Sequence, residues 1–388
     1  MKKYFIFIFL LVSLFVFSGC SKEEEKIELN NLSISHEEKF GGIYINITID
    51  DFNSKGFKFG DSLEISFSNG YELEDLPYYN GYYTDTGMPL LVGYSGYPYI
   101  RAGINNGDDL FIVSKVKETD TANIKLGKRG KYLDIQESLD IHYSDVQGDL
   151  TDEEFGNFRC VNVGQLKENI LYRSASPVDN QHNRAGVVDK LIKDKVNTII
   201  NLSDNDSELV EHFSKSDFNS PYAKSLYDRG SIIALSMNMN FTSSNGEEDK
   251  APKLFGEFKD NLFSSKLISG LRFALNNDGP YLVHCVEGKD RTGFVCMVFE
   301  ALAGASYTEI IDDYMVTYNN YYGINKKSEP VKYKIIKEKN IDVMLRTIIG
   351  DDCVNIETAN YSNYIEKYLI SKGMSETEVR ALKTKLCK

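Results

Sequence analysis

The order of apolar and polar residues divides the chain into a strand-rich part and a mixed part. Residues 43–49 and 62–68 alternate apolar with polar or amphipathic side chains, which is the period of a half-buried strand. The second run ends at Asn69-Gly70, a dipeptide typical of hairpin turns. Further strands are expected at residues 89–94 and 110–116. We therefore expect residues 28–120 to form an all-β barrel or sandwich.

The pattern changes along the next part of the chain. Residues 121–156 are polar and irregular, and we expect them to connect two domains. From residue 157 on, short apolar strands alternate with helical segments, which favours an α/β fold with a central, mostly parallel sheet. These strands are expected at residues 170–172, 198–202, 232–235 and 281–284. The C-terminal domain is thus predicted at residues 157–388, and its signals beyond residue 290 are almost wholly helical.

Length and composition agree with two folded domains. A chain of 388 residues is too long for one ordinary core, and its 42% hydrophobic and 26% charged residues are typical of a globular protein. The net charge of -13 argues against a nucleic-acid partner and repels anionic ligands. Phosphate chemistry in this chain therefore needs positive charge that is concentrated locally.

The first twenty residues have the pattern of a targeting segment. Two lysines precede an apolar run that is too short for a comfortable membrane span. The run ends in Ser18-Gly19-Cys20, which resembles the bacterial lipoprotein processing site. The resemblance implies cleavage before Cys20 and acylation of that cysteine, hence a lipid anchor on the extracytoplasmic face of the bacterial cell membrane. Residues 21–27 then form a charged tether. The alternative is an ordinary signal peptide with an incidental cysteine.

The remaining cysteines do not have a metal-binding pattern. The chain has no C-x-x-C pair and no short Cys/His cluster, so we do not expect a structural metal. Cys353 and Cys387 either pair across the C-terminal helices or stay unpaired. Unpaired packing thiols are the favoured interpretation for these two and for Cys160 and Cys296.

Residues 280–293 carry the clearest chemistry, because an apolar strand leads through a short loop into a helix-forming run. The loop begins at Cys285 and ends at Arg291, with five residues between them. Its backbone N–H groups are expected to point inward, and the next helix directs its positive N-terminus to the same place. Arg291 can hold two oxygens of a bound phosphate through its planar guanidinium group. The predicted phosphate-binding residues between the two ends are Val286, Glu287, Gly288, Lys289 and Asp290.

The same positive field acts on the Cys285 thiol. A free thiol has a pKa of about 8.5, and helix N-termini with cationic neighbours lower it to roughly 3.5–7.5. We therefore expect a Cys285 thiolate that attacks phosphorus in line and forms a thiophosphate intermediate. Thr292 is expected to donate its hydroxyl to the sulfur and so stabilise it as a leaving group, while His284 orients the loop through backbone hydrogen bonds. No metal ion or organic cofactor is needed in this scheme.

The run His-Cys-x-x-Gly-Lys-Asp-Arg-Thr-Gly at residues 284–293 resembles the signature of the bacterial tyrosine phosphatase family, a branch of the cysteine-dependent phosphatase superfamily. The likeness covers about residues 155–388 and does not include the β domain. It implies a phosphoric monoester hydrolase whose substrates are phosphotyrosine proteins, with phosphoserine or phosphothreonine, phosphoinositides and inositol phosphates as further classes. Similar segments occur at residues 157–159, 171–175, 196–202 and 312–315.

The proton donor for the leaving group is less clearly marked. Family members commonly carry Asp-Leu-Arg at the end of the second strand, whereas residues 201–204 of this chain are Asn-Leu-Ser-Asp. Asp204 is our first candidate and Asp290, inside the loop, is the second. Asp204 can equally be a turn former, and Asp290 can instead pair with Arg173 and brace the loop.

Two basic residues have supporting roles in this interpretation. A lysine at the place of Lys289 goes, in the superfamily, with acceptance of phosphoinositides or other multiply phosphorylated substrates. Alternatively, Lys289 only balances Glu287. Arg173 is expected to anchor the loop from below.

Two other classes of protein compete with the enzyme. A phosphate-binding module without turnover is disfavoured by the presence of Cys285 and Arg291. A sulfur-transfer or redox protein is disfavoured by the lack of a nearby resolving cysteine.

Overall fold

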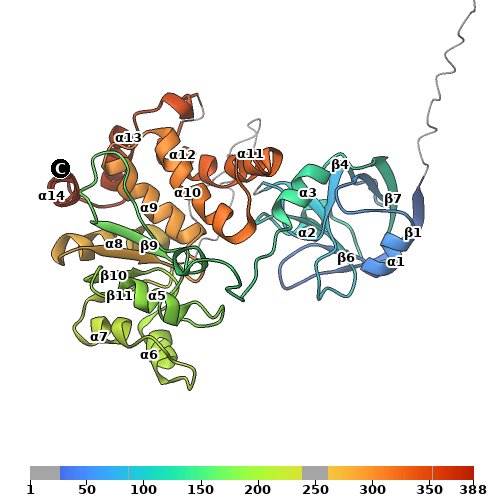
Figure 1. Ribbon diagram of the computed structural model, residues 1–388. Helices are drawn as coiled ribbons and strands as arrows, with labels where there is room; N and C mark the ends of the chain where they lie inside the picture. The colour runs from blue at the N-terminus through green and yellow to red at the C-terminus, as the bar shows by residue number, and fades with distance from the viewer. Residues whose placement is uncertain (1–26, 86, 238–260, 352) are drawn as a thin grey trace, which may run out of the picture.

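The computed structural model describes residues 27–85, 87–237, 261–351 and 353–388, which form two lobes (Figure 1). The expected signal segment, Cys20 and all but the last residue of the expected tether lie outside these residues. In the part of the chain that is described, no helix has both the length and the apolar character needed to cross a bilayer.

The N-terminal lobe is a closed barrel of seven strands in the order β1-β2-β6-β5-β4-β3-β7. The alternating runs at residues 43–49 and 62–68 contain β2 and β3, and the predicted turn at Asn69-Gly70 joins β3 to β4. The all-β prediction is consistent with this barrel. The strands are β1 (Glu28–His36), β2 (Ile43–Ile45), β3 (Ser62–Phe67), β4 (Glu72–Tyr79), β5 (Pro89–Val92), β6 (Ile100–Ile104) and β7 (Thr121–Lys128).

Three features of the N-terminal lobe differ from what the sequence pattern indicated. Strand β7 pairs with both β1 and β3 and so closes the barrel, which therefore extends beyond residue 120 into the expected connection. The strand expected at residues 110–116 is instead helix α2 (Leu110–Ser114). The Asp109 side chain caps this helix by accepting a hydrogen bond from the backbone N–H of Phe111. A short helix, α1 (Ile49–Ser54), likewise starts where we expected the strand at 43–49 to end.

The segment between the lobes contains helices α3 (Leu133–Leu139) and α4 (Asp152–Phe155). Helix α3 packs against α11 (Pro330–Lys339) of the C-terminal lobe, and Figure 1 shows the two helices side by side. An ion pair between Lys339 Nζ and Asp85, 2.7 Å long, joins the same two lobes. The expected connection is thus a packed part of the fold.

The C-terminal lobe contains a five-stranded sheet in the order β11-β10-β12-β9-β8. The first four strands are parallel, and only β8 runs antiparallel to its neighbour β9. The predicted mostly parallel sheet is confirmed. The strands are β8 (Arg159–Cys160), β9 (Leu171–Ser174), β10 (Thr198–Asn201), β11 (Ile232–Ala234) and β12 (Tyr281–His284).

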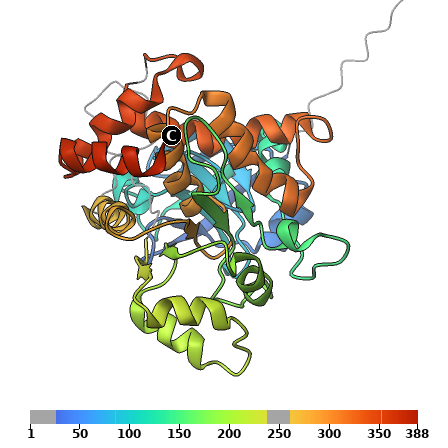
Figure 2. The same cartoon turned by 60° about the vertical axis from the view of Figure 1, so that its left-hand side comes forward.

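Each face of this sheet is covered by helices, so alternate residues of a strand enter different cores. In β12, Tyr281 and Val283 belong to the core formed with the C-terminal helices, whereas Leu282 belongs to the core formed with α5 and α7. Figure 2 shows the two helical layers on opposite sides. Besides α11, the described helices of this lobe are α5 (Ala185–Ile192), α6 (Asp206–Ser214), α7 (Pro221–Asp228), α8 (Asn261–Asn276), α9 (Asp290–Leu302), α10 (Tyr307–Tyr322), α12 (Ile341–Ile349), α13 (Tyr361–Ser371) and α14 (Glu376–Leu386).

The helical C-terminal part is confirmed by helices α9 to α14. Cys353 and Cys387 are both free thiols, as are Cys160 and Cys296, which agrees with the favoured of the two interpretations.

Candidate active site

The loop that begins at Cys285 lies at the carboxyl end of the central strand β12, between β10 and β9. It leads directly into α9, which starts at Asp290. Parallel strands bring their carboxyl ends to one edge of a sheet, where α/β proteins commonly bind ligands. The fold therefore places the loop, the N-terminus of α9 and the segments after β9 and β10 next to each other.

Gly288 allows the loop to curl tightly against the end of β9. Its φ of +69° is in the left-handed region that favours glycine. A Cβ atom at this position would lie 2.1 Å from the carbonyl oxygen of Ser174, a distance that real Cβ contacts do not show. Glycine is therefore required here both for the backbone conformation and for the space.

Side chains from other elements hold the outer carbonyl groups of the loop. The Asn157 amide donates to the carbonyl oxygens of Glu287 (3.3 Å) and Gly288 (3.2 Å). Tyr321 donates its hydroxyl to the Glu287 carbonyl at 2.7 Å, and Arg173 Nη2 donates to the Gly288 carbonyl at 3.1 Å. The backbone N–H groups of residues 286–289 donate to no acceptor within the described ranges. Successive free N–H groups of this kind form a concavity suited to an anion.

Arg173 is anchored beneath the loop by a buried carboxylate. Its Nη1 lies 2.5 Å from Oδ2 of Asp313, and Arg159 Nε lies 2.8 Å from the other oxygen of that carboxylate. Burial alone would raise the pKa of Asp313, but the two guanidinium groups outweigh it and hold the pKa well below its usual range. The partner of Arg173 is thus Asp313 from α10, not Asp290 as one of our alternatives had it.

The two residues at the ends of the loop are close to the sheet edge. Cys285 is buried, with 3% of its surface exposed. Arg291 Nη1 donates to the carbonyl oxygens of Leu202 and Met237, and both distances are 3.4 Å. Leu202 follows β10, and Met237 follows β11. Thr292 is fully buried, and its hydroxyl has no hydrogen-bond partner among the residues that the structure describes. The expected bond from Thr292 to the sulfur therefore stays a prediction.

His284 is fully buried at the end of β12. Its Nδ1 lies 3.2 Å from the carbonyl oxygen of Cys285, a backbone contact of the kind expected for it. Burial lowers the pKa of His284 to about 4, so the imidazole is neutral at neutral pH.

The two candidate proton donors are in different surroundings. Asp204 is buried, and its Oδ2 accepts hydrogen bonds from the Asn201 amide (2.8 Å) and the Ser203 hydroxyl (2.9 Å). Its Oδ1 lies 3.4 Å from His212 Nε2 of α6. These contacts fit the alternative in which Asp204 forms a turn. Asp290, by contrast, is 51% exposed beside the loop and accepts a hydrogen bond from the Tyr314 hydroxyl at 3.3 Å.

Lys289 is paired within the loop. Its Nζ lies 3.0 Å from Oε2 of Glu287 and donates to the Tyr322 hydroxyl at 3.3 Å. This contact is the balancing role that we gave as an alternative. Burial disfavours the charged form of Lys289, but Asp290, Glu287 and nearby tyrosines outweigh it and raise the lysine's pKa.

Sequence reasoning did not assign roles to several residues that contact the loop. Asn157 and Asp313 lie in segments that resemble the family. This resemblance indicated that both residues have a role, but it did not indicate what that role is. Tyr143 lies in the expected connection and had no signal at all. Its ring stacks on Tyr321 with 4.8 Å between centroids, so this segment reaches the C-terminal lobe.

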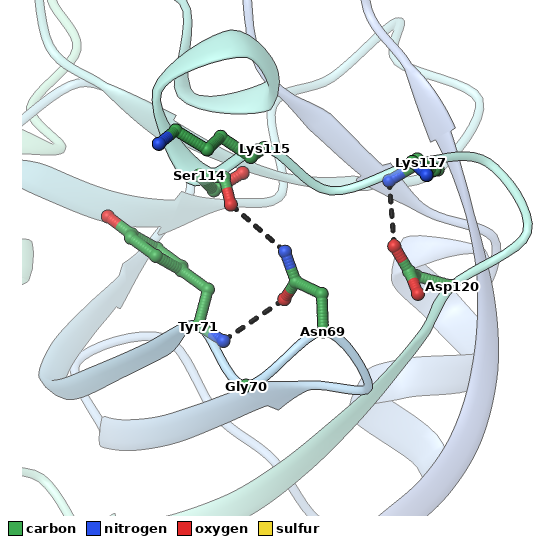
Figure 3. A pocket seen from close by; sticks show the side chains of 7 residues that line it. All are labelled: Asn69, Gly70, Tyr71, Ser114, Lys115, Lys117 and Asp120. Carbon is green, nitrogen blue, oxygen red and sulfur yellow. Dashed lines mark hydrogen bonds between the residues drawn. The ribbon is translucent and has the colours of Figure 1, made fainter.

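The barrel carries a separate pocket of about 520 Å³ near the β3–β4 turn (Figure 3). Several polar groups that line it already bond to each other. The Asn69 amide donates to the Ser114 carbonyl at 3.0 Å, and the Lys117 N–H donates to Asp120 at 2.8 Å. No role follows for this pocket. Its lining consists of Asn69, Gly70, Tyr71, Ser114, Lys115, Lys117 and Asp120.

Several known proteins are similar to this chain. A tyrosine-protein phosphatase of Nostoc commune is 30% identical over 130 residues, which are 30% of this chain and 42% of that protein. The chain thus spans about two fifths of the length of this curated relative. The catalytic core of the PP-IP phosphatase SIW14 from S. cerevisiae is 21% identical, with a TM-score of 0.25 over 49% of this chain and 90% of that one. A second structure of the Siw14 catalytic core is 19% identical, also with a TM-score of 0.25, over 52% of this chain and 95% of that one. The sequence model of the tyrosine phosphatase family matches residues 154–388, more than half of the chain, and the chain belongs to that family.

Proposed function

We propose that this chain is a phosphoric monoester hydrolase that uses Cys285 as its nucleophile. The observation that carries the proposal is the arrangement of the loop. Its outer carbonyls are held by Asn157, Arg173 and Tyr321, and the backbone N–H groups of residues 286–289 have no acceptor in the described structure. Such a ring of donors beside a cysteine and the N-terminus of α9 suits a phosphate dianion.

In the first step, the Cys285 thiolate attacks phosphorus while Arg291 and the loop N–H groups hold the phosphoryl oxygens. The sulfur–phosphorus bond forms as the bond from phosphorus to the leaving oxygen breaks, and that oxygen takes a proton from a carboxylic acid. In the second step, water attacks phosphorus and gives a proton to the same, now ionised, carboxylate. The sulfur–phosphorus bond breaks, and free phosphate and thiolate are restored.

We propose Asp290, our second candidate, as the proton donor. Asp204 already accepts hydrogen bonds from Asn201 and Ser203 and lies beside His212, which leaves its carboxyl group little freedom to reach a leaving group. Asp290 is half exposed and adjoins Arg291 in the sequence. Its only described hydrogen-bond donor is Tyr314.

The test is hydrolysis of p-nitrophenyl phosphate by the purified chain in detergent, in the presence of a metal chelator. We expect turnover that vanadate blocks and that Cys285→Ser abolishes, while the Ser variant still binds vanadate. Equal turnover by the wild type and the Ser variant would contradict the proposal. Binding without turnover by the wild type would instead favour a phosphate-binding module.

We also propose that the protein is anchored in the bacterial cell membrane, on its extracytoplasmic face, through a lipid on Cys20. The support is the sequence pattern of residues 1–20 alone. Bacteria that express the chain and are fed a radiolabelled fatty acid should label it, and Cys20→Ala should abolish both the label and the membrane association. Label that persists in the Ala variant rules the anchor site out.

A further inference from the structure

Lys289 is surrounded by negative charge on the rim of the loop. Its Nζ lies 3.0 Å from the Glu287 carboxylate and 3.9 Å from that of Asp290. The side chains of Lys289 and Glu287 are only 19% and 30% exposed, so water screens their pairing less than it would screen a surface pair. The charges of Lys289 and Glu287 cancel, by simple addition of their ordinary charges at neutral pH.

Glu287 is held from two directions. Its carbonyl oxygen accepts the hydrogen bond from Tyr321, which fixes the backbone. Its carboxylate pairs with Lys289 at 3.0 Å, and this lysine, with smaller contributions from Tyr143 and His182, keeps the pKa of Glu287 low although burial works the other way. The carboxylate is therefore ionised at neutral pH and directed at the lysine. The Tyr143 hydroxyl itself lies 3.3 Å from Nε2 of His182.

Tyr143 comes from the segment between the two lobes. Its ring stacks on Tyr321 and meets Tyr322 edge-on, with 5.8 Å between the ring centroids of Tyr143 and Tyr322. The Arg184 guanidinium lies 4.8 Å from the centroid of the Tyr143 ring and so adds a cation–π contact. Tyr143 lies outside the matched family region, 154–388. Through Tyr321 this packing places it beside the loop from Cys285 to Arg291.

The pairing has a consequence for substrates with more than one phosphate. A second phosphate needs a cation of its own, because Arg291 holds the phosphate that binds at Cys285. Lys289 is the other cation of the loop. Such a phosphate would have to displace the Glu287 carboxylate from Lys289. A substrate with a single phosphate has no such contact to make.

We propose that Glu287 is a specificity-determining residue that neutralises Lys289 and makes the site favour single phosphate monoesters over multiply phosphorylated substrates. This inference rests on the proposed function. It runs against the simplest interpretation of a lysine at this loop position, which is acceptance of multiply phosphorylated ligands.

The test compares kcat/KM for inositol hexakisphosphate with kcat/KM for p-nitrophenyl phosphate. Glu287→Gln should raise this ratio about tenfold, because Lys289 becomes free to contact a second phosphate. Glu211→Gln is the matched control, since it removes the same charge from an exposed position of α6 and should leave the ratio as it is in the wild type.

A second comparison keeps the inference testable without turnover. In the Cys285→Ser background, Glu287→Gln should tighten binding of inositol hexakisphosphate at least threefold more than binding of phenyl phosphate, measured by calorimetry. Adding Lys289→Met should remove that gain. A change of less than threefold in both comparisons, or an equal change in the Glu211→Gln control, would overturn the inference. Hydrolysis that survives Cys285→Ser would instead contradict the proposed function.

Discussion

Arg173 and Asp313 form a buried ion pair beneath the loop from Cys285 to Arg291, with 2.5 Å between Nη1 and Oδ2. The other terminal nitrogen of Arg173 donates to the carbonyl of Gly288. One guanidinium group therefore connects a carboxylate of α10 with the backbone of the loop. The shape of the loop depends on a helix that begins well after the Cys-to-Arg segment ends.

Replacing Asp313 by Asn should strongly destabilise the C-terminal lobe. The change leaves the buried guanidinium groups of Arg159 and Arg173 without a counter-charge, and removal of one partner of a buried pair costs about 3–5 kcal/mol. Urea denaturation followed by helical circular dichroism measures this loss. The neighbouring Asp312→Asn is the control, because the Asp312–Lys326 pair is exposed and exposed pairs contribute about 1 kcal/mol or less. Similar losses for the two variants would contradict the buried network.

Gly288→Ala should abolish activity. The new Cβ would require the backbone of Ser174 to move, which reshapes the loop, and left-handed backbone costs a non-glycine residue about 1–2 kcal/mol in addition. Gly304→Ala is the control, since Gly304 has a similar φ of +74° with no atom within 4 Å of the added Cβ. Gly304→Ala should lose a comparable amount of stability to backbone strain but keep its kcat per folded molecule. Full activity of Gly288→Ala would show that the loop tolerates a side chain.

The buried His284 should make stability depend on pH in acid. Its pKa is about 4 in the folded state and about 6.5 in the unfolded chain, so between these values the unfolded state binds more protons. Stability is therefore complete above about pH 6.5 and falls as the pH drops towards 4, by about 3 kcal/mol in total. Urea denaturation at several pH values, compared with His284→Asn, isolates this contribution. The same slope in both proteins would refute a buried neutral imidazole.

Asp290→Asn should affect poor leaving groups most. Proton donation typically contributes 10²–10⁴-fold, and a phosphoserine peptide, with its basic alkoxide, needs it more than p-nitrophenyl phosphate does. We expect the loss in kcat/KM to be at least tenfold larger for the peptide. Asp204→Asn should instead lower activity on both substrates by the same factor, because it disturbs a turn. If the leaving-group dependence appears in Asp204→Asn, the assignment of the two carboxylates must be exchanged.

Much of the site could be predicted because the loop is one continuous stretch of sequence. Cys285, Arg291 and the strand before them are neighbours along the chain, so their spacing alone indicates an anion cradle. The parallel sheet was likewise visible in the alternation of strands and helices. These signals are local.

The contacts that support the loop are not local. Asn157 and Asp313 are 131 and 25 residues from Gly288 along the chain, by subtraction of their numbers, and no period or spacing connects them. Tyr143 reaches the loop only because α3 and the chain after it pack against the C-terminal lobe. Helix α2 was mistaken for a strand because Ile112 and Val113 are apolar but exposed. Tertiary packing decided each of these cases.

The central claim is that Cys285 carries the phosphoryl group during turnover. Rapid acid quench of the chain with a ³²P-labelled aryl phosphate, followed by digestion and mass spectrometry, tests it directly. We predict label on the peptide that contains Cys285, lost in Cys285→Ser and chased by unlabelled substrate. Steady turnover with no labelled protein at any quench time, or label on another residue, would contradict the account.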